Sequence, residues 1–126
     1  MKALSLWQPW ASLIWDGRKR IETRPWPMHY RGPLAIHAAM RVDKEACRKF
    51  GFNPNTIYRG AVLCIVNVVD CVQFPNPKAA PDSYGDFSAG RYGFIMKLVG
   101  RFDPPFPAKG HQGIWNWENA LMEDSK

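Results

Sequence analysis

The run from Gly60 to Phe74 is the feature that most limits what this chain can fold into. The run is rich in Val and Ile, whose branched side chains pack well on a pleated sheet. It is also long enough for one strand to bend and to pair with neighbours on both of its edges. Shorter extended segments are expected around it. They are Ala3–Leu6, Lys19–Arg24, Leu34–Ala38, Arg91–Val99 and a further candidate, Arg101–Phe106.

Helical patterns are few and short. Trp10 and Ile14 lie at helical spacing, with a proline before them and a glycine after, which predicts a helix over about residues 9–16. A second helix is expected over Asp43–Phe52, and Ile114–Trp117 fits a short helix or a closing strand. No long helix separates successive strands. We therefore expect an α+β, mostly β fold: a small curled β-barrel of about five or six mainly antiparallel strands with two or more flanking short helices.

The length of the chain bounds the number of domains. With 126 residues, 46% of them hydrophobic and 22% charged, the chain has the size of one domain with one core. We expect a single domain over residues 1–121 and a frayed acidic tail over residues 122–126. The longest apolar stretch, Ala61–Val72, is interrupted by Asn67 and Asp70, so no membrane partner is expected.

Cysteine and histidine usage indicates neither metal nor redox chemistry. The three cysteines form no CxxC pair, which predicts reduced thiols and a cytoplasmic location. The N-terminal residues lack the apolar length of a signal peptide. The three histidines show no metal-ligand spacing, and no glycine-rich phosphate loop or nucleophile elbow occurs. We expect no metal ion, no cofactor and a monomer.

The charge balance is basic and uneven. The chain has 17 Lys and Arg residues and 11 Asp and Glu residues, which gives a net charge of +6. Residues 1–31 contain six basic residues but only two acidic ones, Asp16 and Glu22. A basic surface attracts nucleic acid because phosphate binding releases counterions, although it can also serve solubility alone. The same part of the chain is rich in tryptophan. Basic residues interleaved with aromatic rings are typical of single-stranded nucleic-acid sites, but at least three of the six Trp residues are expected to be structural.

Ionisable residues gather in the segment Gly17–Arg24. Alternate side chains of an extended segment share a face, which would group Glu22 with Arg24 and place Lys19 and Thr23 on the other side. A turn after the glycine would instead rotate Lys19 back towards Glu22. Such a cluster is a structural clamp, a binding site, or a catalytic site in which Lys19 activates a hydroxyl, that of Thr23 or of Ser5. The sequence leaves these alternatives open.

Three blocks of the sequence together resemble the ASCH domain family. They are Leu4-Ser5-Leu6-Trp7-Gln8-Pro9-Trp10-Ala11-Ser12-Leu13, the GxKxxExR segment with Lys19, Glu22 and Arg24, and Arg31-Gly32-Pro33-Leu34-Ala35-Ile36-His37-Ala38. The central strand and the segment Pro107–Trp115 extend the resemblance over nearly the whole chain. The branch that contains activating signal cointegrators is the most similar. The resemblance implies a PUA-like, closed β-barrel and a cleft, proposed as a nucleic-acid site, where the signature segment meets the barrel.

The resemblance also assigns residues to this cleft. Lys19, Glu22 and Arg24 are the signature residues, and other family positions near the cleft are matched by Gln8, Trp10, Trp26, Arg31 and His37. In the function expected first, a nucleic-acid-binding module, Lys19, Arg24 and Arg31 would contact phosphate. Trp10 or Trp26 would stack a base, and Glu22 would orient Arg24 or accept a hydrogen bond from a base amino group. The expected partner is RNA, another nucleic acid or a modified nucleoside.

A hydrolase in the same cleft is the alternative function. One branch of the family hydrolyses N4-acetylcytidine with a Lys, a Thr and a distant Glu, and other members are described as ribonucleases. Lys19 matches that Lys, whereas Glu22 occupies the Thr position and Thr23 is one place further on. Asp82 and Asp86 are the nearest candidates for the distant Glu. If the protein is an enzyme, Lys19, Glu22 and Thr23 are the candidate catalytic residues. A protein-interaction module using the tryptophan-rich surface is a third hypothesis.

Overall fold

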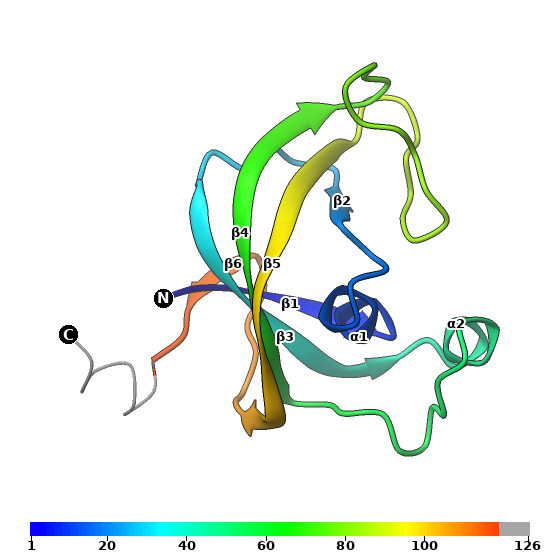
Figure 1. The fold of residues 1–126 in the computed structure, drawn as a ribbon, viewed down its shortest axis with the longest axis vertical. Helices are drawn as coiled ribbons and strands as arrows, with labels where there is room; N and C mark the ends of the chain where they lie inside the picture. The colour runs from blue at the N-terminus through cyan, green and yellow to red at the C-terminus, as the bar shows by residue number, and fades with distance from the viewer. Residues whose placement is uncertain (119–126) are drawn as a thin grey trace.

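The computed structural model describes residues 1–118, which form six strands and two short helices (Figure 1). In chain order they are β1 (Lys2–Gln8), α1 (Trp10–Trp15), β2 (Ile21–Arg24), β3 (Gly32–Val42), α2 (Lys44–Lys49), β4 (Ala61–Gln73), β5 (Tyr92–Pro107) and β6 (Ile114–Asn116). Each expected strand and helix is present. The two segments expected at Arg91–Val99 and Arg101–Phe106 are one continuous strand, β5, and the undecided segment near the C-terminus is strand β6. Residues 119–121 of the expected domain and its expected tail lie outside the described residues.

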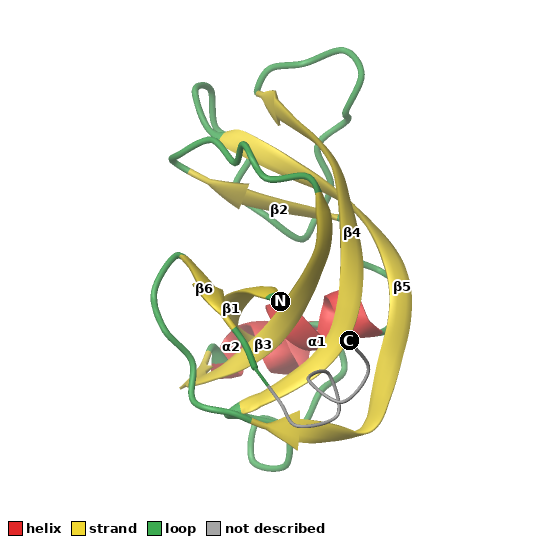
Figure 2. Cartoon of the chain, turned by 90° about the vertical axis from the view of Figure 1, so that its left-hand side faces the viewer, coloured by secondary structure: helices red, strands yellow, loops and turns green. Residues whose placement is uncertain are grey.

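All six strands form one mixed sheet in the order β2-β5-β4-β3-β1-β6. Neighbouring strands are antiparallel except β1 and β3, which run parallel. β4 lies near the centre and pairs with β3 on one edge and with β5 on the other, which confirms the prediction from the length of the Gly60–Phe74 run. Figure 2 shows how strongly β3, β4 and β5 curl around the interior.

The expected closure into a barrel is wrong. β2 and β6 are the two ends of the sheet, and no strand pairing joins them within residues 1–118. Both end strands are short: β2 has 4 residues, and β6 has 3 and pairs only with Lys2–Leu4 of β1. We call the gap between β2 and the β1–β6 end of the sheet the seam. A side chain bridges part of it, because Nη2 of Arg24 in β2 donates to the carbonyl oxygen of Ser5 in β1 at 3.2 Å.

The main core lies inside the curl of the sheet. Leu4, Leu34, Ile36, Val66 and Phe94 are completely or almost completely buried there. Each such side chain contributes roughly 1.5–3 kcal/mol through its burial. Most tryptophans are structural, as expected. Trp115 and Trp117 are buried in a second, smaller cluster, and Trp10, Trp15 and Trp26 pack against the main core.

Two loops complete the walls of the seam. In the loop between β4 and β5, the backbone N–H of Asp86 donates to Oγ1 of Thr23 at 3.2 Å, which fixes this loop against β2 (Figure 1). The loop between β5 and β6 lies against β1 and β3. At Gly110 a Cβ would come within 2.6 Å of atoms of both Ser5 and His37, so only glycine fits this approach without a shift.

Candidate functional site

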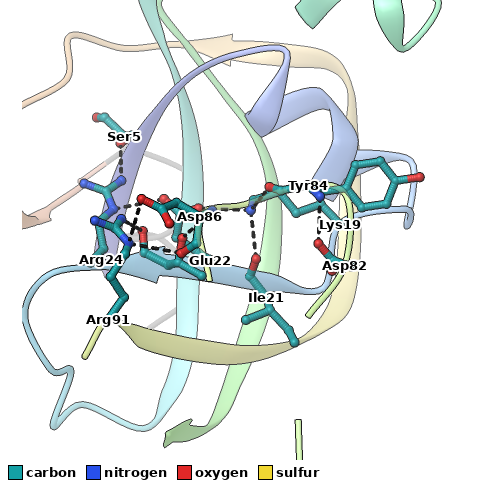
Figure 3. Close-up of polar contacts among 10 residues, drawn as sticks. Ser5, Lys19, Ile21, Glu22, Arg24, Asp82, Tyr84, Asp86 and Arg91 are labelled. Atoms are coloured by element: carbon teal, nitrogen blue, oxygen red, sulfur yellow. Dashed lines mark hydrogen bonds and ion pairs between the residues drawn. The ribbon is translucent and has the colours of Figure 1, made fainter. Parts of the chain in front are cut away.

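Lys19 is the most deeply buried charged residue of the protein's described part, with 2% of its surface exposed. A turn at Gly17, with φ +88°, precedes the lysine, whose side chain is directed towards Glu22, which is the second of the two arrangements that the sequence left open. Its Nζ donates to the carbonyl oxygens of Ile21 at 2.8 Å and Tyr84 at 2.6 Å, and lies 3.2 Å from Oε1 of Glu22 (Figure 3). All three N–H groups of the ammonium therefore have partners.

Glu22 connects this buried lysine to Arg24. Its other carboxylate oxygen, Oε2, accepts a hydrogen bond from Nε of Arg24 at 2.9 Å. Arg24 also donates to the carbonyl of Ser5, as described above. A chain of charge-assisted hydrogen bonds thus runs from the interior to the seam of the sheet. A guanidinium carries five N–H groups. Among the described residues, Arg24 uses two of them, which leaves others for an anion.

Two adjoining cavities open at this seam. We name the first, of about 550 Å³, the signature chamber. Its walls come from Trp10, Lys19, Glu22, Thr23, Arg91 and residues 83–86. The second, of about 940 Å³, is the tryptophan chamber. Its walls come from Trp26, His37, Met40, Gly60 and residues 108–113. Ser5, Trp7 and Arg24 line both chambers, so the two form one cleft. Both volumes lie in the range that is typical of small-molecule binding pockets.

His37 lies beneath the tryptophan chamber and is 1% exposed. Its Nε2 is 2.6 Å from the carbonyl oxygen of Ala108, which can only accept, so Nε2 carries the proton and Nδ1 accepts from Oγ of Ser5 at 2.9 Å. Nε1 of Trp115 donates to the same hydroxyl oxygen at 3.1 Å. Burial lowers the pKa of His37. The hydrogen bond to Ala108 raises this pKa, and the charge of His111 lowers it further. The imidazole is therefore neutral at pH 7 and holds the β5–β6 loop on β1.

Thr23 and the two aspartates do not form the arrangement expected for a hydrolase. Thr23 lines the signature chamber, but its hydroxyl accepts from the backbone of the β4–β5 loop, and no hydrogen bond joins it to Lys19 among residues 1–118. Asp86 also lines the chamber. Hydrogen bonds from the hydroxyl and backbone N–H of Ser88 lower its pKa, so the carboxylate is ionised at neutral pH. Asp82 does not line the chamber and accepts from the backbone N–H of Tyr84 at 2.7 Å.

Two residues that the sequence assigned to the cleft lie outside both chambers. Gln8 is buried and accepts from the backbone N–H of Ser12 at 2.9 Å while donating to the carbonyl of Tyr58 at 2.7 Å, so it fixes the start of α1. Arg31 donates to the carbonyl of Met28 at 2.8 Å. We therefore do not include Gln8 or Arg31 in the candidate site. The other six predicted residues line the chambers: Trp10, Lys19, Glu22, Arg24, Trp26 and His37.

Comparison with known proteins identifies the family of the chain. The family model of the ASCH domain matches residues 4–92. The chain belongs to the ASCH domain family. Over 98% of its length this ASCH domain is 29% identical to activating signal cointegrator 1 from Homo sapiens and 30% identical to that of Mus musculus. The chain spans 23% of the length of each of these relatives.

A solved structure has the same fold as this ASCH domain. The crystal structure of ASCH from Zymomonas mobilis matches with a TM-score of 0.58 and 16% identity, covering 98% of this chain and 90% of that one. At this identity the likeness concerns the fold alone. The recognition of the family from the sequence blocks is confirmed.

Sequence reasoning missed several side chains of the ASCH cleft. Trp7 lines both chambers, Arg91 lines the signature chamber, and Lys109 and His111 line the other. Arg91 reaches the cleft because β5 pairs with β2, and residues 108–113 reach it because their loop packs on His37. The sequence of Pro107–Trp115 resembles the family, but no local pattern indicates that this segment packs over β1.

The described residues of this ASCH domain give no sign of a metal centre or a membrane span. In residues 1–118 no three His, Cys, Asp or Glu side chains are grouped in a way that could hold a metal ion. No helix in the same part of the chain has the length and apolar character needed to cross a bilayer.

Proposed function

We propose that this ASCH domain binds nucleic acid, and RNA in particular, in the cleft formed by the two chambers. The observation that carries the proposal is the position of Arg24. Its guanidinium is fixed by Glu22 and Ser5 at the junction of the chambers, with N–H groups remaining for a phosphate, and lies 5.9 Å from the centre of the Trp26 ring. Cations that position phosphates next to rings that stack bases are the usual elements of single-stranded recognition. The ASCH resemblance implies the same class of ligand.

In this proposal the cations of the cleft have different roles. Lys19 is a positioning residue, because its ammonium is fully hydrogen-bonded and holds Glu22 and the β4–β5 loop in place. Arg24 and the exposed Lys109 contact the phosphates. Arg91 donates to the carbonyl oxygens of Thr23 and Asp86, so it contributes charge to the signature chamber and stabilises its wall. Phosphate binding at the cleft thus depends on Arg24 more than on any other residue.

A salt titration tests this function. Fluorescence anisotropy of a labelled ten-nucleotide single-stranded RNA should show binding at low salt that weakens steeply as salt rises. Arg24→Ala should reduce the salt slope by about one unit. Arg31→Ala is the matched control, because it removes an arginine outside the chambers and should leave the slope unchanged. Absence of binding at low salt, or equal behaviour of the two variants, would reject the proposal.

A hydrolase acting on a modified nucleoside or on RNA is the second candidate. One observation favours it: Lys19, Glu22 and Thr23 line the same chamber. Thr23→Val is the informative variant, since it removes the hydroxyl and keeps the shape of the side chain. A hydrolase of this kind releases product from N4-acetylcytidine or single-stranded RNA, and the variant does not. Failure of the wild-type protein to release product at high concentration, with and without divalent metal ions, rejects this candidate.

A further inference from the structure

The two chambers differ in charge. The signature chamber contains the carboxylates of Glu22 and Asp86. The residues that line the tryptophan chamber include no Asp or Glu within the described chain, and Arg24 and Lys109 give it positive charge. Much of its wall comes from residues 108–113, which follow the end of the ASCH match at residue 92. Lys19, Arg24 and Arg91 also line the signature chamber, so both halves of the cleft contain cations, and only the signature chamber adds carboxylate oxygens that accept hydrogen bonds.

Trp7 provides an aromatic face where the chambers meet. Its side chain lies at the surface, with 46% of the residue exposed, and lines both chambers. The guanidinium of Arg41 lies 3.9 Å from the centre of the indole ring, a cation–π contact that holds the ring in one orientation. Trp26 is held by contact with Phe94, with ring centres 5.3 Å apart. Rings with fixed orientation stack a base with little loss of side-chain entropy.

Arg24 lies where the two chambers meet and lines both of them. Glu22 and the carbonyl of Ser5 fix its Nε and Nη2, so the plane of the guanidinium is set before a ligand arrives. A planar arginine fork is suited to two-point contact with a phosphate. A phosphate at this position would have the signature chamber on one side and Trp7 on the other.

We propose that the cleft recognises two consecutive nucleotides of a single strand. The first base occupies the signature chamber, where the carboxylates of Glu22 and Asp86 accept hydrogen bonds from its exocyclic amino group. The phosphate that links the nucleotides binds Arg24. The second base stacks on Trp7 in the tryptophan chamber, and the following phosphate lies towards Lys109. This inference rests on the proposed nucleic-acid function and adds the length of the recognised unit, the requirement for an amino-bearing first base, and a stacking residue.

Binding of cytidine probes of increasing length tests the two-nucleotide unit. Isothermal titration calorimetry is done with CMP, with the dinucleotide pCpC and with a ten-residue oligocytidine, at one low salt concentration. We expect pCpC to bind at least tenfold more tightly than CMP. Trp7→Ala should reduce that ratio to below threefold, and Trp7→Phe should retain most of it. Tyr58→Ala is the matched control, because Tyr58 is also exposed and lines neither chamber, and should leave the ratio unchanged.

The outcomes separate this inference from the function on which it rests. If the ten-residue oligocytidine binds while CMP and pCpC differ by less than threefold, the two-nucleotide unit is wrong and the nucleic-acid function stands. The same holds if Trp7→Ala keeps the full ratio. If neither the oligocytidine nor the labelled RNA binds, both are wrong. Thermal unfolding of each variant confirms that it is folded, which we expect because the replaced side chains lie at the surface.

Discussion

The ammonium of Lys19 and the carboxylate of Glu22 lie 3.2 Å apart beneath the cleft, with side chains only 1% and 11% exposed. Removal of the ammonium leaves Glu22 with Arg24 as its remaining ionic partner and takes the donor from the carbonyl oxygens of Ile21 and Tyr84, which together costs about 3–5 kcal/mol. Lys19→Met should therefore lower the free energy of unfolding by about this amount, measured by urea denaturation. Lys97→Met replaces an exposed lysine on β5 and should change it by no more than about 0.5 kcal/mol.

This ion pair also decides how binding data on Lys19 are interpreted. A Lys19 variant that binds RNA poorly has two explanations, a lost phosphate contact or a displaced Glu22 and β4–β5 loop. The hydrogen bonds of the ammonium to Ile21 and Tyr84 favour the second. If Lys19→Met were as stable as Lys97→Met, the ammonium would not be held as the structure shows, and a direct phosphate contact by Lys19 would become the better explanation.

The hydrogen bonds of His37 predict a dependence of stability on pH. Burial lowers the pKa of His37 in the folded protein below its value of about 6.5 in the unfolded chain. Between the two pKa values the unfolded chain binds a proton and the folded protein does not, so stability rises with pH. The contribution is complete above pH 6.5 and is lost as pH falls through the folded-state pKa. Urea denaturation from pH 7.5 to 5 should show this loss.

A pair of histidine variants identifies the group responsible. His37→Asn removes the titrating ring, and the decrease in stability between pH 6.5 and 5 should become smaller. His29→Gln replaces an exposed histidine and should leave the decrease as it is in the wild-type protein. Equal pH profiles for wild type and His37→Asn would show that the decrease comes from other groups.

Gly110 holds the β5–β6 loop close to the Ser5–His37 hydrogen bond. A Cβ at this position would lie 2.6 Å from both Cε1 of His37 and Oγ of Ser5. The loop must shift in Gly110→Ala, at a cost of roughly 1–3 kcal/mol in the free energy of unfolding. RNA affinity should fall as well, because Lys109 moves with the loop. Gly100→Ala is the control, since a Cβ there meets no atom within 4 Å. Equal melting temperatures for the two variants would contradict the close approach.

Local patterns in the sequence were sufficient to predict the elements of this fold. The β-branched run at Gly60–Phe74 predicted a central strand, and the glycine at position 17 allowed the turn that brings Lys19 to Glu22. Closure of the sheet was predicted wrongly: β2 and β6 form as strands, but they are the two ends of the sheet and do not pair with each other within residues 1–118. Whether two end strands meet depends on the twist of the whole sheet, which a single sequence does not reveal.

The cleft could be predicted only in part for a similar reason. The family blocks identified Lys19, Glu22 and Arg24 because these residues lie close together in the sequence. Trp7 and Lys109 are about one hundred positions apart and line the same chamber only because the β5–β6 loop packs on His37 of β3. Gln8 was assigned to the cleft because it matches a family position, whereas its side chain accepts a hydrogen bond from the backbone N–H of Ser12 in α1.

Arg24→Lys separates the charge of Arg24 from its geometry. Lysine retains the positive charge but cannot donate at once to Glu22, to the carbonyl of Ser5 and to a phosphate in one plane. RNA affinity should therefore fall, while the salt slope stays within about half a unit of the wild-type value. Arg24→Ala should lose both affinity and about one unit of slope.

Parallel anisotropy titrations at four salt concentrations, with Arg31→Lys as the control, measure both quantities for each variant. Full affinity in Arg24→Lys would mean that charge alone acts at this position. The fixed guanidinium plane at the junction of the two chambers would then have no role in binding, and the assignment of the linking phosphate to Arg24 would be lost with it.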